Sequence, residues 1–333
     1  MKKNRATMAD VAKVAGVSRQ LVGFVFQGKS GFSPEAAARV HKAAQQLGYR
    51  PNLAAQSLRR DSTKIIGVVF DPRESSPLEI IQSLYKVAAN LGYEVILSAI
   101  GDDRDEDEAI HELIGYRCEG LILIASRLAE AKLVGLATEI PFISIGRQLD
   151  VSIADSVSSD GAMGLGLVVD HLAVLGHSDI AYINATTMLD ADSRLKGFVD
   201  SATRHKLNHR IIDVASDYTE ESGAAAAQLL LASASLPTAV ACSNDQQALG
   251  LISALRVAGI SVPDQVSVVG YDDSRVARFS FMSLTTVHQD AVELAEIALN
   301  RLIERISKPT LAAQASLTSV SLVQRKSVVA KSL

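Results

Sequence analysis

Hydrophobic positions change their spacing at about residue 62. Beyond that point, short runs of consecutive apolar residues alternate with stretches in which apolar residues recur every three or four positions. Continuous apolar strands between amphipathic helices are typical of parallel sheets that helices cover on both faces. The predicted strands are residues 64–70, 94–100, 120–124, 141–145, 180–183, 211–215, 238–242 and 266–269. The predicted helices are residues 77–92, 105–116, 161–175, 192–205, 220–232 and 245–258.

The number of these strand–helix units exceeds what one mononucleotide-binding half contains, so we expect an α/β core of two doubly wound parallel-sheet subdomains. Ligands bind such sheets at the carboxyl ends of the strands. The cleft between the two subdomains is therefore the first place to look for a ligand site.

The first 62 residues follow a different pattern, with signals for three short helices. Thr7 is a good N-cap, with Asp10 three residues later at the electropositive end of a helix. Gly16 is a natural stop, and Ser18 can cap a second helix two residues later. Two short helices joined by a tight glycine turn are the helix-turn-helix signature. A Ser-Pro pair then opens a third helix, residues 34–47.

Charge separates the same two parts of the chain. Residues 1–62 hold eleven Lys and Arg and three acidic residues, a charge of +8, whereas the whole chain is −4 and its remainder therefore −12. A basic head on an acidic body favours phosphate binding by the head alone. A solvated basic tail is the alternative, which the regular capping and glycine signals argue against.

From Thr7 to about Arg325 the chain resembles the lactose-repressor/galactose-repressor (LacI/GalR) family of bacterial transcription regulators. The resemblance is carried by residues 7–22, by the Ser-Pro pair at 33–34 and by residues 47–59. It implies a three-helix head and a hinge helix, followed by a core of the periplasmic-binding-protein-like type that the chain crosses near residues 160, 290 and 322. The implied domains are 1–50 (helix-turn-helix), 51–62 (hinge helix or linker) and 63–333 (core), with an N-subdomain of about 63–160 and 290–322 and a C-subdomain of about 161–289 and 323–333.

The first residues of the second helix of such a head face the base edges. Arg19 can pair bidentately with guanine and Gln20 with adenine, and a phosphate contact is the alternative for either. The family usually has Ser-Arg where this chain has Gly23 and Phe24. Gly23 costs about 0.5–1 kcal/mol of helix propensity, and Phe24 can contact a thymine methyl but donates no hydrogen bond. We therefore expect an operator that differs from the family consensus.

The hinge segment is too short to form a stable helix alone. In the family it folds on DNA, pairs with its twin in the dimer and enters the minor groove. Leu58 matches a leucine that wedges between base steps, which makes DNA deformability part of the specificity; a buried linker contact is the alternative. The expected DNA-binding residues are Thr7, Ser18, Arg19, Gln20, Leu21, Gly23, Phe24, Lys29, Asn52, Ala55, Leu58 and Arg59.

Family positions that point into the cleft give the expected effector-binding residues, with surface or helix-capping roles as the alternative. They are Ser75, Arg147, Asp160, Arg194, Asp245, Asp272 and Gln289. An arginine opposed by carboxylates suits a polyhydroxylated ligand, because each hydroxyl both donates and accepts. The family often has aromatic residues near position 77, but this chain has no Trp and only 5% aromatics. The ligand class therefore stays open between a sugar, a sugar phosphate, a polyol and a nucleobase, as does a cleft without an effector.

Other classes of protein are less well supported. No dinucleotide-binding glycine motif, nucleophile elbow or phosphate-binding loop follows a predicted strand, so we expect no enzyme and no cofactor. The seven His have no metal-like spacing, and the acidic run at residues 102–108 reads as a loop that enters a helix, so we expect no metal.

A solute-binding protein would share the core, but the chain begins without a secretory signal and carries a basic head. No apolar run approaches the roughly 18 residues of a membrane span. Cys118 and Cys242, both placed in apparent strands, are expected to be buried thiols in a reducing compartment, the cytoplasm. Residues 324–333 are too short for the extra leucine-heptad helix of the family's tetramers. We therefore expect a homodimer on a pseudo-palindromic operator in double-stranded DNA, with a small-molecule effector and no membrane partner.

Overall fold

The computed structural model describes residues 6–26, 30–49, 62–74, 76–186, 191–214 and 218–331. It divides the chain into two units, a head of residues 1–63 and a core of residues 64–333. The head contains three described helices, α1 (Met8–Ala15), α2 (Arg19–Phe26) and α3 (Pro34–Leu47). These bounds confirm the three helices expected from the sequence.

Local capping explains where the helices of the head begin and end. The Thr7 hydroxyl accepts from the Asp10 N–H at 3.3 Å, and the Asp10 carboxylate accepts from the Thr7 N–H at 2.8 Å, which is a reciprocal capping box. Gly16 ends α1 with φ 65°, a left-handed conformation that glycine adopts without strain. The Ser18 hydroxyl then accepts from the Leu21 N–H at 3.1 Å at the start of α2. The side chains that these caps bring together form a small buried core: Val11, Ala12, Ala15, Val22, Val25, Val40, Ala43 and Ala44.

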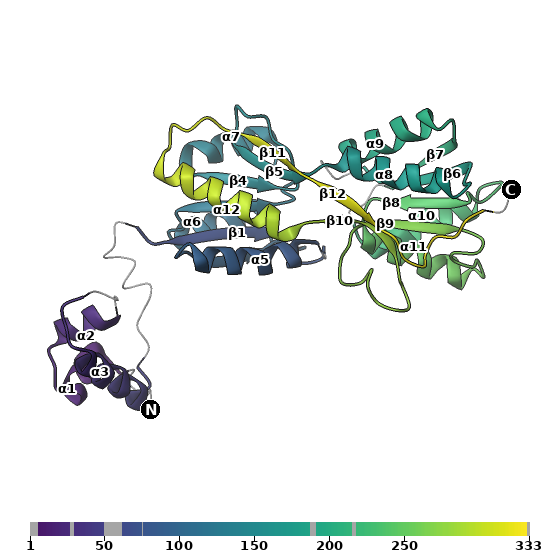
Figure 1. Ribbon diagram of the computed structural model, residues 1–333. Coiled ribbons are helices and arrows are strands. Elements are labelled where there is room, and N and C mark those ends of the chain that lie inside the picture. The colour runs from purple at the N-terminus through teal and green to yellow at the C-terminus, as the bar shows by residue number, and fades with distance from the viewer. Residues whose placement is uncertain are drawn as a thin grey trace. The chain divides into compact units, whose positions relative to one another are not determined.

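The described part of the core contains two six-stranded sheets (Figure 1). The first has the order β11-β5-β4-β3-β1-β2 and the second β12-β10-β9-β8-β6-β7. The strands of the first sheet are β1 (Ile65–Phe70), β2 (Glu94–Ala99), β3 (Gly120–Ile124), β4 (Phe142–Ile145), β5 (Asp155–Ser159) and β11 (Ala315–Thr318). The strands of the second are β6 (Asp179–Ala185), β7 (Asn208–Val214), β8 (Ala239–Cys242), β9 (Ser267–Asp272), β10 (Thr285–Gln289) and β12 (Val320–Val323). Neighbouring strands run parallel except β12, which is antiparallel to β10.

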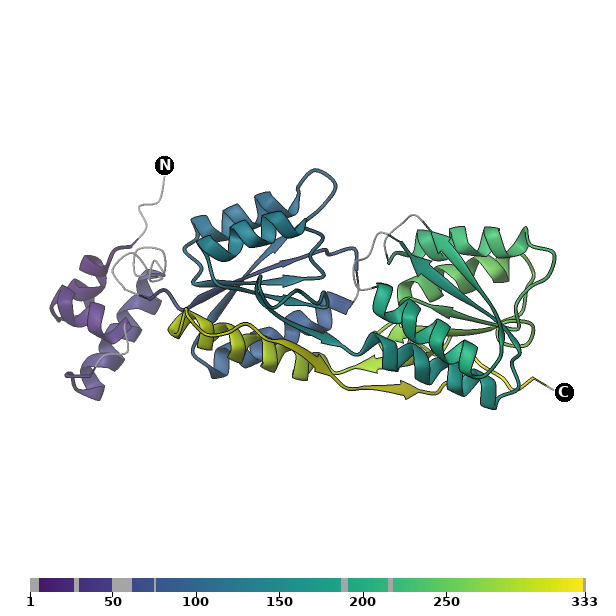
Figure 2. The ribbon, with the colours of Figure 1, turned by 90° about the horizontal axis from the view of Figure 1, so that it is seen from above.

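Helices cover both faces of each sheet, as the view from above shows (Figure 2). On the first sheet, α5 (Ser76–Asn90) and α12 (Ala291–Ser307) pack into one apolar cluster, and α6 (Glu106–Gly115) and α7 (Glu130–Glu139) into the other. The corresponding pairs on the second sheet are α10 (Glu220–Leu231) with α11 (Asp245–Val257) and α8 (Gly161–Val174) with α9 (Ala191–Arg204). The predicted doubly wound α/β class is thereby confirmed. Over the residues that the structure describes, none of the helices has the length and apolar character to cross a membrane.

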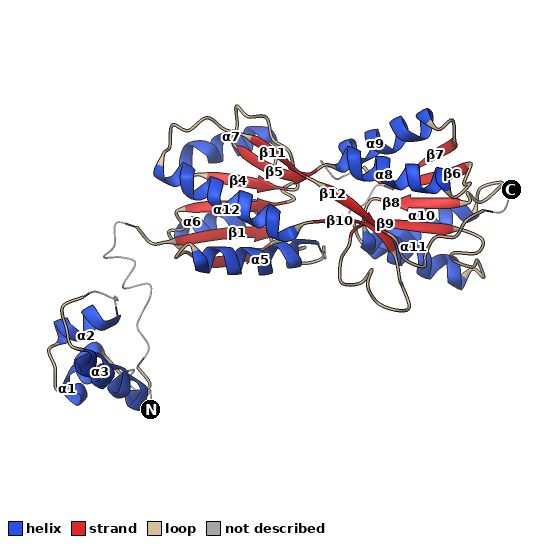
Figure 3. Ribbon diagram, viewed as in Figure 1, coloured by secondary structure: helices blue, strands red, loops and turns tan. Residues whose placement is uncertain are grey.

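The chain passes from one sheet to the other at three places (Figure 3). Asp160 lies between β5 and α8, and Asp290 lies between β10 and α12. The third passage is at Ser319, between β11 and β12, rather than near residue 322 as expected. The reason is that Val320–Val323 pairs with β10 in the second sheet, so these residues belong to the C-subdomain.

Two glycines allow α10 and α11 to pack with their backbones in contact. A Cβ at Gly250 would lie 1.8 Å from the Glu220 carbonyl oxygen, and one at Gly223 would lie 1.9 Å from the Gln247 carbonyl oxygen. Both obstacles are backbone atoms, which cannot rotate away as a side chain can. The N-terminus of α11, which enters the region between the two subdomains, is therefore positioned by this close approach.

We predict that Gly250→Ala destabilises the core by about 3 kcal/mol or more, because overpacking against backbone forces the two helices apart. Gly166→Ala in α8 is the matched control, since no atom lies within 4 Å of its added Cβ. The control should gain about 0.5–1 kcal/mol from helix propensity. Urea unfolding followed by circular dichroism measures both changes, and equal stabilities of the two variants would contradict this account of the packing.

Candidate functional site

The start of α2 is one of the exposed parts of the head. Arg19 and Gln20 are exposed in its first turn, whereas Val22 and Val25 are buried in the head core. This arrangement leaves a guanidinium and an amide free to reach base edges from the N-terminal end of the second helix.

The other head residues expected to bind DNA have diverse surroundings. Thr7 and Ser18 cap α1 and α2, and Leu21 is partly buried against the head core. Gly23 has no atom within 4 Å of the position that a Cβ would take, so a larger residue fits there, and Phe24 is half-buried. The remaining expected residues lie outside the described residues: Lys29, Asn52, Ala55, Leu58 and Arg59.

A cleft lies between the two sheets of the core, at the carboxyl ends of their strands. It contains one cavity of about 170 Å³, bordered by Gln148 and Ser158 from the first subdomain and by Arg194 from α9. An adjoining cavity of about 40 Å³ shares Arg194 and Gln289 with the first. Both subdomains thus contribute polar side chains to one continuous site.

Arg194 is the cation of this cleft and is held in a fixed orientation. Its side chain is buried, and its guanidinium lies 4.1 Å above the ring of Tyr271 and 5.2 Å from that of Tyr218. One guanidinium nitrogen donates to the Ser243 carbonyl oxygen. Stacking on aromatic faces keeps the plane of an arginine fixed, which suits directional recognition of ligand oxygens.

Asp272 and Gln289 form a hydrogen-bonded pair that borders the same cleft as Arg194. The Gln289 side-chain nitrogen donates to the Asp272 carboxylate at 2.5 Å, and both residues border the cleft cavity of about 40 Å³. Asp272 has φ 113°, a conformation that costs energy for any residue other than glycine. Of the expected effector-binding residues, Arg194, Asp272 and Gln289 are therefore brought together in the cleft.

Asp245, which was expected to bind the effector, does not border the described cavities. It is completely buried, and its carboxylate accepts from the Ser274 N–H at 2.7 Å, the Ser274 hydroxyl at 2.8 Å and the Thr286 hydroxyl at 2.6 Å. The residue that borders the cleft is Asn244, whose side chain also caps α11 by accepting from the Gln247 N–H. The turn from β8 into α11 rotates the Asp245 side chain into the subdomain.

Two further expected residues have structural partners away from the cavities. Asp160 caps α8 by accepting from the Met163 N–H at 2.8 Å. Arg147 is buried and donates to the Leu128 carbonyl oxygen at 2.5 Å. Neither borders the described cavities, and Ser75 lies outside the described residues.

Glu74, Gln148 and Asn244 are among the polar residues of the cleft that sequence reasoning missed. The buried Glu74 carboxylate pairs with Arg127 at 2.9 Å, from a loop that follows the neighbouring strand β3. Its signal was available, because Glu74 lies in the loop that follows β1, at the end of a parallel strand where ligands bind such sheets.

Comparisons with known proteins agree with both parts of the chain. Residues 7–52 match the model described as bacterial regulatory proteins, lacI family, and residues 169–328 match a periplasmic binding protein-like domain. The chain is 31% identical over 334 residues to the HTH-type transcriptional regulator GalR of Escherichia coli (strain K12), covering 98% of this chain and 97% of that protein. The chain belongs to the LacI family.

Solved structures of other proteins are also similar to this LacI-family chain. A structure of the lac repressor dimer bound to operator and the anti-inducer ONPF has a TM-score of 0.82 and 29% identity, over 98% of this chain and 100% of that one. A transcriptional regulator CelR–cellobiose complex has a TM-score of 0.71 and 26% identity, over 97% of this chain and 100% of that one. The LacI family consists of regulatory proteins and not of enzymes, in agreement with the expectation from sequence.

We predict a pH dependence of stability that comes from Asp245. Burial, opposed by three hydrogen-bond donors, raises the pKa of this carboxyl from 3.8 to about 7. The folded state therefore binds a proton that the unfolded state has lost between pH 4 and pH 7, so the stability falls as the pH rises through that window. The slope is on the order of 1 kcal/mol per pH unit.

Urea unfolding of the wild type and of Asp245→Asn at several pH values checks this prediction. The variant should have a flatter profile between pH 4 and 7, because it has no proton to bind at this position. Asp103→Asn removes an exposed carboxyl and serves as the control. Parallel profiles for the wild type and Asp245→Asn would show that Asp245 is ionised in the folded core.

Proposed function

We propose that this protein is a sequence-specific transcriptional repressor whose affinity for operator DNA is modulated by a small molecule in the core cleft. The observation that carries the proposal is the exposed pair Arg19 and Gln20 at the start of the second helix of a basic head. Membership of the LacI family and similarity to a lac repressor dimer bound to operator support it. Two heads of a homodimer would contact the two half-sites of a pseudo-palindromic operator in the cytoplasm.

Phosphate and base contacts have separate roles in this proposal. The +8 charge of residues 1–62 supplies affinity that does not depend on sequence and weakens with salt. Arg19 and Gln20 supply base readout in the major groove. Leu58 of the hinge segment is proposed to open a central base step from the minor groove, which favours operators with a flexible step there.

The cleft chemistry favours a neutral, hydroxyl-rich effector. Arg194 and Gln289 donate hydrogen bonds, and Glu74 and Asp272 accept them, so both needs of a hydroxyl group are met across the cavity. Because Glu74 is paired with Arg127, and Asp272 lies in the same cleft as Arg194, these four described residues leave no net positive charge to attract a phosphate group. Similarity to a regulator in complex with cellobiose supports a sugar or a sugar derivative. Arg147 and Asp160 are proposed to shape the cleft from behind the residues that contact the ligand, and effector binding by Ser75 stays a prediction.

A solute-binding protein without regulatory function is the second candidate, because the core would be shared. The periplasmic binding protein-like match over residues 169–328 is the observation in its favour. A solute-binding protein would have no use for a head with capped helices and exposed residues at the start of the second helix. A measurement of operator binding therefore distinguishes the two candidates.

We predict that selection of bound sites from random DNA by the full chain returns a palindrome that differs from the family consensus where position 24 reads it. The physical reason is that Phe24 contacts a thymine methyl but cannot donate to a base, and Gly23 offers no hydroxyl to a phosphate. Gly23→Ser with Phe24→Arg should shift the selected sequence toward the family consensus, since the space at Gly23 is open.

Lys13→Ala, an exposed charge on α1, is the control for a general loss of phosphate contacts. It should lower affinity for all sites about equally and leave the selected sequence unchanged. Return of the common family consensus by the wild-type chain would refute the specificity proposal, and an absence of any enriched site would refute the proposed function.

A further inference from the structure

Two of the side-chain contacts that join the two subdomains within the described residues lie at the edge of the cleft. Arg278, in the loop after β9, has its guanidinium 3.6 Å from the Glu79 carboxylate on α5. The Gln246 side-chain nitrogen, at the start of α11, donates to the Arg73 carbonyl oxygen at 2.9 Å. Because α5 packs on the first sheet while α11 and the loop belong to the second, both contacts depend on how closely the subdomains approach.

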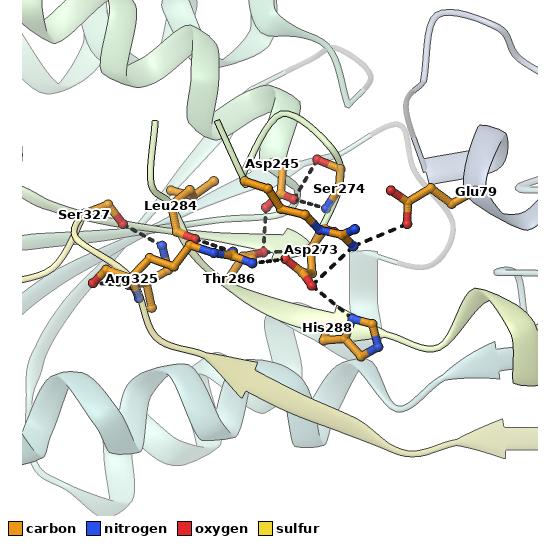
Figure 4. A network of polar contacts seen from close by, with 11 residues as sticks. Glu79, Asp245, Asp273, Ser274, Leu284, Thr286, His288, Arg325 and Ser327 are labelled. Carbon is orange, nitrogen blue, oxygen red and sulfur yellow. Dashed lines mark hydrogen bonds and ion pairs between the residues drawn. The ribbon is translucent and has the colours of Figure 1, made fainter. Parts of the chain in front are cut away.

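Arg278 does not reach Glu79 as a flexible surface side chain. The same guanidinium nitrogen donates to the Asp273 carbonyl oxygen at 2.6 Å. The Asp273 carboxylate in turn accepts from Arg325 at 2.5 Å and lies 3.2 Å from His288 Nδ1. Figure 4 shows Asp273 within this network, between Arg325 on one side and Glu79 on the other. An arginine that is already held loses less side-chain entropy when it forms an ion pair.

Asp273, whose carbonyl oxygen accepts from Arg278, directly follows the cleft residue Asp272 in the chain. Asp272 borders the cleft with φ 113°, and Asp273 follows with φ 51°, so two consecutive residues have backbone angles that L-amino acids rarely adopt. Such strain persists only where the surroundings determine the conformation. Here the determining contacts are those of the buried Asp245 carboxylate with Ser274, as Figure 4 shows.

Residues from both subdomains border one small cavity beside the contact between Arg278 and Glu79. Glu79, Asp272 and Ser274 all border a space of about 10 Å³ at the edge of the cleft. A ligand oxygen that displaces Gln289 from the Asp272 carboxylate would act on a backbone segment whose next carbonyl oxygen holds Arg278. Occupancy of the cleft and closure of its edge are therefore mechanically linked through a single peptide.

We propose that Glu79 and Arg278 form an ionic latch between the subdomains, that Asp273 is its positioning residue, and that the latch couples ligand occupancy at Asp272 to subdomain closure. The coupling to a ligand rests on the proposed effector function. The latch itself does not, because it acts in the absence of ligand and DNA.

Distances between the subdomains test the latch directly. Spin labels on Asp103→Cys and Ala225→Cys report one exposed position in each subdomain. The native thiols compete little for the label, since Cys118 and Cys242 are buried and burial raises the pKa of Cys118 to about 12. Full-length labelled chains, diluted with excess unlabelled chain, give the intrachain distance distribution by double electron–electron resonance without ligand or DNA.

Arg278→Gln and Glu79→Gln should each raise the ratio of open to closed chains by about two- to fivefold, the range of a partly exposed ion pair. The double variant should open no further than either single variant, because the two changes remove one interaction. Salt on the order of 0.5 M should open the wild type in the same way and leave Arg278→Gln unchanged.

Arg256→Gln is the matched control. It removes an equal charge, and its guanidinium donates to the Phe281 carbonyl oxygen of the same loop without contacting the first subdomain. An unchanged distance distribution in Arg278→Gln, additive opening in the double variant, or equal opening in Arg256→Gln would each overturn the latch. None of these results would bear on operator binding, which is measured separately.

Discussion

The cleft depends on one constraint, which is that the chain passes between its two sheets three times within a narrow region. The passages lie at Asp160, Asp290 and Ser319, and each comes directly after a strand of one sheet. Carboxyl ends of parallel strands share an edge, so these passages bring the open edges of the two sheets together. Arg194, Asp272 and Gln289 meet there although almost a hundred residues separate the first from the last. The Tyr271 hydroxyl also lies 3.1 Å from the Ser159 hydroxyl at the first passage, which ties the second sheet to the end of β5.

Two buried carboxylates at the cleft are paired with arginines of their own subdomain. Glu74 pairs with Arg127 in the first subdomain, and Asp273 pairs with Arg325 in the second. Paired groups need little further compensation when the cleft closes and excludes water. The Glu79–Arg278 contact is different, since its partners belong to different subdomains. A contact of this kind allows closure to be reversible at modest cost in free energy.

The sequence predicts the head and most of the core because these parts follow local rules. Caps and glycines fix α1 to α3, and apolar runs fix β1, β3 and β8. Four strands escape prediction, namely β5, β10, β11 and β12, because they are short and rich in polar residues, some of which are buried by distant partners. In β5, the buried Asp155 carboxylate is bound by Arg301 and Arg305, about 150 positions later in the chain. No periodicity within five residues contains that information. In the site, the family position was sufficient to place Arg194 in the cleft. Which of Asn244 and Asp245 borders the cavity depended on the rotation of one turn. The role of Asp160 likewise depended on a local capping bond that a cleft position does not reveal.

The central claim is that the cleft and the reading head of one chain are linked through the free energy of binding. The most direct measurement is a thermodynamic cycle on the full-length dimer, at fixed salt, with the operator from site selection and a neutral sugar found by calorimetric screening. Operator affinity is measured with and without the sugar, and sugar affinity with and without the operator. The account predicts the same factor in both directions, about 5- to 150-fold, and its loss in Arg194→Ala, which should still bind the operator. Operator affinity that does not change when a sugar occupies the cleft would contradict the account.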